Sequence, residues 1–158
     1  MHIFSSVLSV NQSHIGGELF EIPVVRALIC HVMRNGNAAI ARALVYDALD
    51  EVRKRTGEHG VELLVRSIDL LRPLVETRSV RVAGSNYQVP FEISEKRQYS
   101  LAFRWLVSAS RSRTERTMSA RLASEIISTV KLQSQSYKKR VELHKMAESN
   151  RAFVHFRW

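Results

Sequence analysis

Three arginines recur at a spacing of seven residues in the stretch EKRQYSLAFRWLVSASR: Arg97, Arg104 and Arg111. Seven residues make close to two turns of a helix, so the three guanidinium groups would share one face. That face lies roughly opposite the apolar stripe that contains Leu101 and Trp105. A guanidinium group is planar and permanently charged, and it binds phosphate through two parallel hydrogen bonds. The spacing indicates phosphate binding, although an ordinary solvated face would show the same pattern.

Basic side chains continue before and after this predicted helix. They lie in two β-rich segments, in the loop that follows the helix and near the C-terminus. The candidates for contact with phosphate are Arg78, Arg81, Arg97, Arg104, Arg111, Arg113, Arg116, Lys138, Lys139, Arg140, Lys145, Arg151 and Arg157. Phe153, Phe156 and Trp158 accompany the last arginines, where aromatic rings either stack on bases or anchor the tail to the helices.

The charge is divided unevenly along the 158 residues, whose net charge is +9. Residues 1–72 contain 8 basic and 8 acidic side chains, whereas residues 73–158 contain 16 basic and 7 acidic ones. The second half therefore carries the whole excess. A strongly basic region beside a neutral one indicates a polyanionic partner. Nucleic acid fits this description best, and an anionic membrane surface is the lesser competitor.

Residues suited to catalysis or metal binding are scattered. The six histidines have neither a Cys/His nor an HExxH metal spacing, and phosphate-binding or nucleophile motifs of enzymes are missing. The single cysteine, Cys30, excludes an internal disulfide, and its place in VVRALICHVM predicts a buried thiol. No apolar run approaches the roughly 18 residues of a membrane span. We expect no enzyme, metal, cofactor, small-molecule substrate or membrane partner.

The framework that must hold these residues is predicted to be mainly α. Apolar residues at helical spacing predict a helix that opens at Pro23 and closes at the RNG turn of residues 34–36. Five further helices are expected at about residues 38–56, 60–71, 95–111, 117–131 and 136–150. Residues 23–158 would form one domain, preceded by an N-terminal extension, residues 1–22, without Lys or Arg.

Between the third and fourth helices the pattern changes to that of two strands, within about residues 74–93. If Gly84 and Ser85 form a two-residue turn, Val82 faces Tyr87. The base would then pack on the helices, and the tip would project. Because an isolated two-stranded ribbon is marginal in water, we expect a ligand to support that tip. The predicted fold is a six-helix bundle with a protruding two-stranded β-hairpin between the third and fourth helices.

Three stretches resemble the family of small-subunit ribosomal protein seven. RPLVETRSVRVAGSNYQVPFEI at residues 72–93 is similar to that family's hairpin, and SLAFRWLVSASRSR at residues 100–113 to the helix that follows it. HKMAESNRAFVHFRW at residues 144–158 resembles its closing motif, and VYDALDEVRKRTG at residues 45–57 fits more weakly. The order and spacing are preserved, so the resemblance covers about residues 23–158.

The resemblance implies a structural constituent of the small ribosomal subunit. Such a protein binds the 3′ major domain of small-subunit rRNA, helps to assemble the head and contacts neighbouring ribosomal proteins. Its hairpin lies near the exit-site tRNA and the path of the mRNA, a position that Gly84, Ser85, Asn86 and Tyr87 would occupy here. The basic side chains named above would be the rRNA contacts.

Some features depart from the bacterial members of that family. They usually begin with a basic arm, whereas residues 1–25 lack Lys and Arg here. They also tend to carry lysines where this chain has RNGNAA, and two glycines where it has Ala83 and Gly84. Such losses are typical of an organellar ribosome, and we expect a mitochondrial one, with a bacterial cytoplasm or a plastid as the alternative.

Two other classes of protein remain possible from the residues alone. A basic helical DNA-binding or architectural protein would place one helix in a groove. Basic charge spread over a hairpin, two helices and a tail favours a large folded RNA instead. An enzyme that acts on RNA would need a convergent acid, base or metal set, which the sequence lacks.

Overall fold

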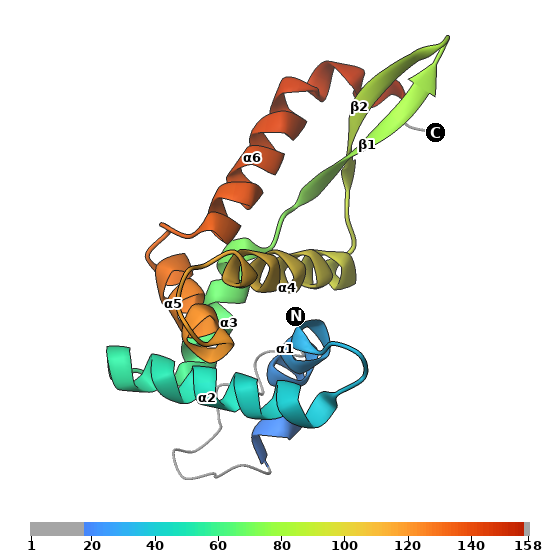
Figure 1. The fold of residues 1–158 in the computed structure, drawn as a ribbon. Helices are drawn as coiled ribbons and strands as arrows, with labels where there is room; N and C mark the ends of the chain where they lie inside the picture. The colour runs from blue at the N-terminus through green and yellow to red at the C-terminus, as the bar shows by residue number, and fades with distance from the viewer. Residues whose placement is uncertain (1–17, 157–158) are drawn as a thin grey trace.

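The computed structural model describes residues 18–156, in which α1–α5 form a bundle and the sixth α-helix and a two-stranded hairpin project from it (Figure 1). The elements are η2 Glu18–Glu21, α1 Pro23–Val32, α2 Ala38–Thr56, α3 Gly60–Leu71, β1 Val75–Val82, β2 Ser85–Glu92, α4 Glu95–Arg111, α5 Met118–Val130, α6 Gln135–Ser149 and η3 Arg151–Phe156. The prediction of a mainly α fold with a hairpin between the third and fourth helices is confirmed. Arg157, Trp158 and residues 1–17 lie outside the described part.

Local signals in the sequence set the ends of the helices. The side chain of Asn37 accepts a hydrogen bond from the Ile40 backbone N–H at 3.4 Å and so caps the start of α2. Gly57 ends that helix in the left-handed region, at φ 75°. Ser134 caps α6 in the same way as Asn37 caps α2, by accepting a bond of 3.0 Å from the Tyr137 N–H. These caps explain why the predicted and observed ends nearly coincide.

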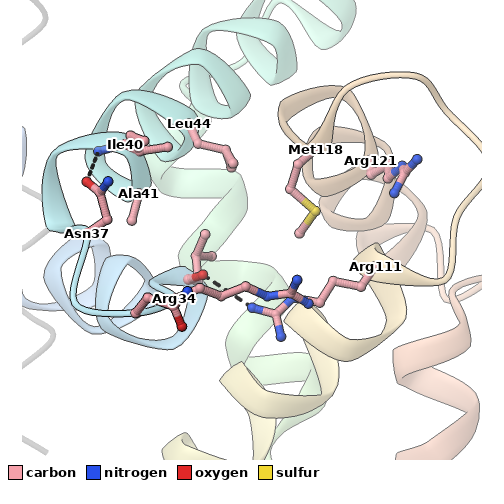
Figure 2. A pocket seen from close by; sticks show the side chains of 10 residues that line it. Arg34, Asn37, Ile40, Ala41, Leu44, Arg111, Met118 and Arg121 are labelled. Carbon is pink, nitrogen blue, oxygen red and sulfur yellow. Dashed lines mark hydrogen bonds between the residues drawn. The ribbon is translucent and has the colours of Figure 1, made fainter.

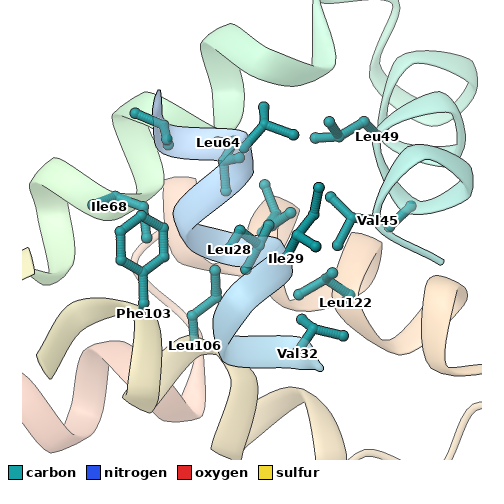
Figure 3. Close-up of a cluster of buried hydrophobic side chains, with 14 of the residues drawn as sticks. Leu28, Ile29, Val32, Val45, Leu49, Leu64, Ile68, Phe103, Leu106 and Leu122 are labelled. Carbon is teal, nitrogen blue, oxygen red and sulfur yellow. The ribbon is translucent and has the colours of Figure 1, made fainter. Parts of the chain in front are cut away.

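The apolar core forms around α1, which is surrounded by α2, α3, α4 and α5 (Figure 3). Leu28 of α1, Leu64 of α3, Leu106 of α4 and Leu122 of α5 are completely buried. Each such side chain stabilises the fold by about 1.5–3 kcal/mol relative to an exposed position. The prediction of a buried Cys30 is wrong, because that residue lies on the outward side of α1 and is exposed.

The hairpin turn lies one residue earlier than predicted. Val82 pairs with Ser85 and Val80 with Tyr87, so the two turn residues are Ala83 and Gly84. Both have positive φ, 49° and 86°, as a type I′ turn requires. Each residue of β1 therefore has a partner two positions away from the expected one. The strands keep their faces, because a shift of two residues preserves the alternation of side chains.

The hairpin is supported along its length by the last part of the chain. In Figure 1 the hairpin and α6 rise from the bundle, and η3, in red, lies against β2. The ring of Tyr87 lies 5.0 Å from that of Phe153 and 5.1 Å from that of Phe156. At the base, the Leu74 N–H donates to His144 Nε2 at 3.2 Å. Phe153 and Phe156 thus anchor the tail on the hairpin, while Trp158 lies outside the described residues.

Candidate nucleic-acid interface

The three regularly spaced arginines of α4 extend from the hairpin to the end of α1. Arg97 donates to Glu76 of β1 at 3.2 Å, and Arg111 donates to the Val32 carbonyl at 3.2 Å. With a rise of about 1.5 Å per residue, this face is roughly 20 Å long. Arg104, between them, is exposed. The helix therefore carries one cation at each end that is held by the protein, and one in the middle that points to solvent.

Glu76 joins the hairpin to the start of α4. Arg78 donates to one of its carboxylate oxygens at 2.8 Å, and Arg97 donates to the other at 3.2 Å. Burial by itself would raise the pKa of Glu76, but the hydrogen bonds and charges of the two arginines outweigh it and lower that pKa. The two cations are thus partly neutralised, and their orientation is set by one carboxylate.

Arg113 is directed into the protein. Its Nε donates to the buried carboxylate of Glu125 at 2.6 Å, its Nη2 donates to the Ser124 carbonyl and the Ser128 hydroxyl, and its Nη1 donates to Glu115 at 3.2 Å. The second oxygen of Glu125 accepts from the Ser136 N–H at 3.1 Å and from its hydroxyl at 2.7 Å. This cluster ties the α4–α5 loop to the start of α6. A negative carboxylate at a helix N-terminus is also favourable for the helix dipole.

Two basic residues of α6 also bond within the protein. Arg140 donates to the Arg72 carbonyl at 3.2 Å, and its guanidinium lies 5.9 Å from the centre of the Tyr137 ring. Lys139 donates to the Ser108 hydroxyl of α4 at 3.4 Å. Arg140 therefore positions α6 beside the end of α3, whereas the long contact of Lys139 leaves most of its charge unneutralised.

The remaining basic residues of the predicted set face solvent. Within residues 18–156 their side chains make no hydrogen bond or ion pair to the protein. They come from the hairpin, α4, the α4–α5 loop, α6 and η3. They are Arg81, Arg104, Arg116, Lys138, Lys145 and Arg151. Their charges are available to an external anion.

The hairpin tip divides into an open part and a covered part. Gly84, Ser85 and Asn86 are exposed at the turn, and Arg81 is exposed beside them. Tyr87, which the sequence analysis placed with the tip, is half-buried beneath η3 instead. The freely projecting part is therefore shorter than predicted.

A pocket of about 560 Å³ opens between the α1–α2 turn, α2, the end of α4 and the start of α5 (Figure 2). Arg34 and Arg111 lie side by side at its base, and Arg121 lies at its rim. Burial, and next the charge of Arg34, lower the pKa of Arg111. The sequence analysis missed Arg34 and Arg121. The available signal for Arg34 was the stretch RNGN, in which an arginine stands next to Asn and Gly, residues that favour a turn. No signal in the sequence pointed to Arg121.

Two other kinds of site were sought in the part of the chain that the structure describes. No group of three or more His, Cys, Asp or Glu side chains could hold a metal ion there. None of the described helices has the length and apolar character needed to cross a membrane.

Comparisons with known proteins identify one family across most of the chain. The family of ribosomal protein S7p/S5e matches residues 5–151. The small ribosomal subunit protein uS7 of Helicobacter hepaticus is 41% identical over 144 residues, which cover 91% of this chain and 93% of that protein. The uS7 proteins of Streptococcus equi subsp. zooepidemicus and Mycoplasmopsis pulmonis are 46% and 44% identical, over 89% of this chain and 90% of theirs.

Proposed function

We propose that this chain, which belongs to the ribosomal protein S7p/S5e family, binds the RNA of the small ribosomal subunit through its basic surface. As a member of that family it is a structural, non-enzymatic constituent of the small subunit. The proposal concerns which side chains bind RNA and which ligands lie near the tip of the projecting hairpin.

The observation that carries this proposal is the set of unpaired basic side chains on the hairpin, α4, the α4–α5 loop, α6 and η3. Arg81, Arg104 and Lys138 are examples from three of these elements. Cations that the protein leaves unneutralised on several elements suit an extended polyanion better than a small ligand. Contacts with phosphate position a protein on RNA without reading its sequence, which suits a protein that holds a folded rRNA domain.

The proposed contacts differ from the set predicted from the sequence in one respect. Arg113 is engaged with Glu125 in the interior, so we assign it to positioning α6 and not to RNA. Arg140 has a comparable role through the Arg72 carbonyl. Arg97 and Arg111 keep free donors beyond their protein contacts, and we retain them as phosphate ligands.

We further propose that the RNA is the 3′ major domain of small-subunit rRNA and that the hairpin tip reaches toward the exit-site tRNA and the mRNA. The support is the family resemblance together with the exposure of Gly84, Ser85 and Asn86 at the end of the arm. Neighbouring ribosomal proteins would cover other surfaces. The compartment we propose is the mitochondrion, because residues 1–25 contain no Lys or Arg.

The first experiment measures affinity for a transcript of the 3′ major domain of a bacterial small-subunit rRNA, with duplex DNA of equal length as the competitor. If the protein contacts six to ten phosphates, a rise in salt from 50 to 200 mM should lower the affinity by a factor of about 10³–10⁵, on the scale known for duplex DNA. The double variant Arg104→Glu/Lys138→Glu should weaken binding by at least tenfold while circular dichroism stays native. Arg53→Glu/Lys54→Glu, two exposed positions on α2, is the matched control. Equal losses in both variants would contradict the proposed surface.

The role of the arm is tested by a shortened hairpin that keeps its register. Replacement of residues 81–86 by Asn-Gly joins the paired residues Val80 and Tyr87 through a type I′ turn. Binding to the transcript should weaken only slightly, because Arg81 is one of several proposed phosphate contacts, and incorporation into subunits should persist, while exit-site tRNA binding weakens. Failure of incorporation would contradict this division of labour.

The compartment is tested by sedimentation of mitochondrial and cytosolic extracts at low magnesium, with the chain followed by mass spectrometry. A peak with the mitochondrial small subunit supports the proposal. A peak with a different small subunit would correct the compartment and leave the role unchanged.

A further inference from the structure

The pocket beside the α1–α2 turn combines uncompensated positive charge with an apolar wall. None of the described residues that line it is acidic. Arg34 and Arg111 come from positions far apart in the sequence, yet their guanidinium groups lie together at the base (Figure 2). Arg111 is held in place by the Val32 carbonyl at 3.2 Å, where a cation also suits the C-terminal end of α1. The fold therefore brings like charges together without a carboxylate to offset them.

The apolar wall faces these arginines and is open to solvent. Leu44 and Met118 face each other across the opening, and Ile40 lies beside them (Figure 2). The side chain of Ile40 is 64% exposed, which makes it one of the two most exposed large apolar residues of the described chain. A surface that only bound phosphates would need no such wall. Apolar side chains next to paired cations suit a ligand with a flat ring and a phosphate.

We propose that this pocket receives one unstacked nucleotide of the bound RNA, with its base against Ile40, Leu44 and Met118 and its phosphate on Arg34 and Arg111. The inference rests on the proposed function and states which part of the RNA this site takes. The volume of about 560 Å³ lies within the range of roughly 300–1,000 Å³ typical of small-molecule sites.

The chemistry of RNA recognition supports such a site. Double-helical RNA hides its bases, so proteins bind the bases of loops and bulges, which stack on aromatic rings or on guanidinium planes. Here the apolar wall of Ile40, Leu44 and Met118 would contact the base in place of an aromatic ring, and the guanidinium groups of Arg34 and Arg111 would hold the phosphate. The nearby N-terminus of α2, whose first N–H groups have no partner within the helix, adds positive potential on the side of the phosphate.

The affinity test uses the full chain and the same 3′ major domain transcript. Ile40→Ser removes the exposed apolar contact and should raise Kd about tenfold, with the slope of log Kd against log salt unchanged. Arg34→Gln should weaken binding and also reduce that slope by about one, because one phosphate contact is lost. Leu74→Ser is the matched control, because Leu74 is also 64% exposed but lies at the hairpin base.

A second measurement reports the base itself. The chain contains four methionines, so a spectrum of ¹³C-methyl methionine has few signals. Addition of the transcript should move the Met118 methyl signal upfield through the ring current of a base. The Met146 signal, from α6, serves as the internal reference. A phosphate or a carboxylate in the pocket would not produce this ring-current shift.

The outcomes separate the pocket from the proposed function. Loss of affinity in Ile40→Ser but not in Leu74→Ser, with an upfield Met118 signal, supports the nucleotide site. If the wild type binds the transcript, but Ile40→Ser binds equally well and the Met118 signal does not move, the nucleotide site is overturned. The proposed RNA binding then still stands. Failure of the wild type to prefer the transcript over duplex DNA overturns the proposed function, and the pocket inference with it.

Discussion

The bundle of α1–α5 and the arm of the hairpin, α6 and η3 hold their shapes by different means. In the bundle, large apolar side chains such as Leu28, Leu64 and Leu122 are completely buried. In the arm, Val89 is the main strand residue buried to that degree, and most other side chains are half-buried or exposed. The arm depends instead on aromatic contacts with η3 and on polar bonds at its base.

This difference shows that one region supplies the apolar core and another region forms the projecting arm. The bundle buries a continuous apolar core, whereas the arm projects from it and carries exposed basic side chains. One joint between the two regions is the cluster of Arg113, Glu125 and Ser136, which holds the first turn of α6; the bonds of Glu76 and Arg140 form others. The direction of the arm therefore depends on a few polar bonds that can be changed one at a time.

The largest effect is expected at that junction. Glu125→Ala leaves the Arg113 guanidinium without its buried partner and should lower the free energy of unfolding by about 3–5 kcal/mol. Urea denaturation measures this loss. Glu51→Ala, which removes an exposed ion pair with Arg55 on α2, is the control and should cost at most about 1 kcal/mol. If both variants lost the same free energy of unfolding, the buried cluster would contribute no more than an exposed ion pair.

The next effect belongs to the core of the bundle. Leu64→Ala removes a completely buried side chain and should cost about 2–5 kcal/mol. The cost reflects both lost apolar burial and the cavity left behind. Val89→Ala, in the arm, removes less apolar surface and should cost less, as measured by the same urea titration. A larger loss at Val89 would reverse the proposed contrast between the two regions.

A smaller effect is expected at the top of the arm. Phe153→Ala removes a ring that packs on Tyr87 and should cost about 0.5–1.5 kcal/mol beyond the lost burial. Amide hydrogen exchange should speed up in β2 while the protection of α3 stays unchanged. Arg151→Ala is a control in the same 3₁₀ helix, because Arg151 is exposed and lies outside the aromatic cluster of Tyr87, Phe153 and Phe156. Faster exchange in α3 as well would mean that arm and bundle unfold together.

The smallest effect concerns pH at the base of the arm. Because the pKa of Glu76 is lower in the folded protein than in the unfolded chain, its stabilising contribution is present above its ordinary pKa. That contribution is lost as the pH falls through the folded pKa, below about 4.5. Urea titrations of the wild type and Glu76→Gln from pH 7 to 3 should therefore converge at the acid end. A constant difference between them would exclude this role of the carboxylate.

The sequence predicted the framework closely and the hairpin less so. The observed bounds of α2, α3 and α4 coincide with the predicted ranges. For α2 and α3 the reason is local, because Asn37, Gly57 and Pro73 act on the backbone next to them. The hairpin turn was misplaced by one residue, because Ala83 adopts a positive φ that is uncommon for a residue with a side chain. The exposed Cys30 was missed because most of the apolar α1 does face the core.

The candidate site was predictable by residue type and not by arrangement. The basic residues of α4 and α6 were identified from charge and spacing alone. The sequence did not show that Arg113 turns inward to Glu125, nor that Arg34 meets Arg111 in a pocket. Nor did it show that Phe153 and Phe156 pack on Tyr87. Each of these facts depends on how distant segments approach one another.

By itself, the sequence determined the secondary structure, the position of the hairpin in the chain, the basic character of the second half and the family. These properties follow from periodicity, capping and charge, which act between near neighbours or add up along the chain. Only the tertiary structure decided which arginines bond inside the protein and which remain free. It also formed the pocket and placed the tail against the arm, because such contacts arise from the packing of helices that are distant in sequence.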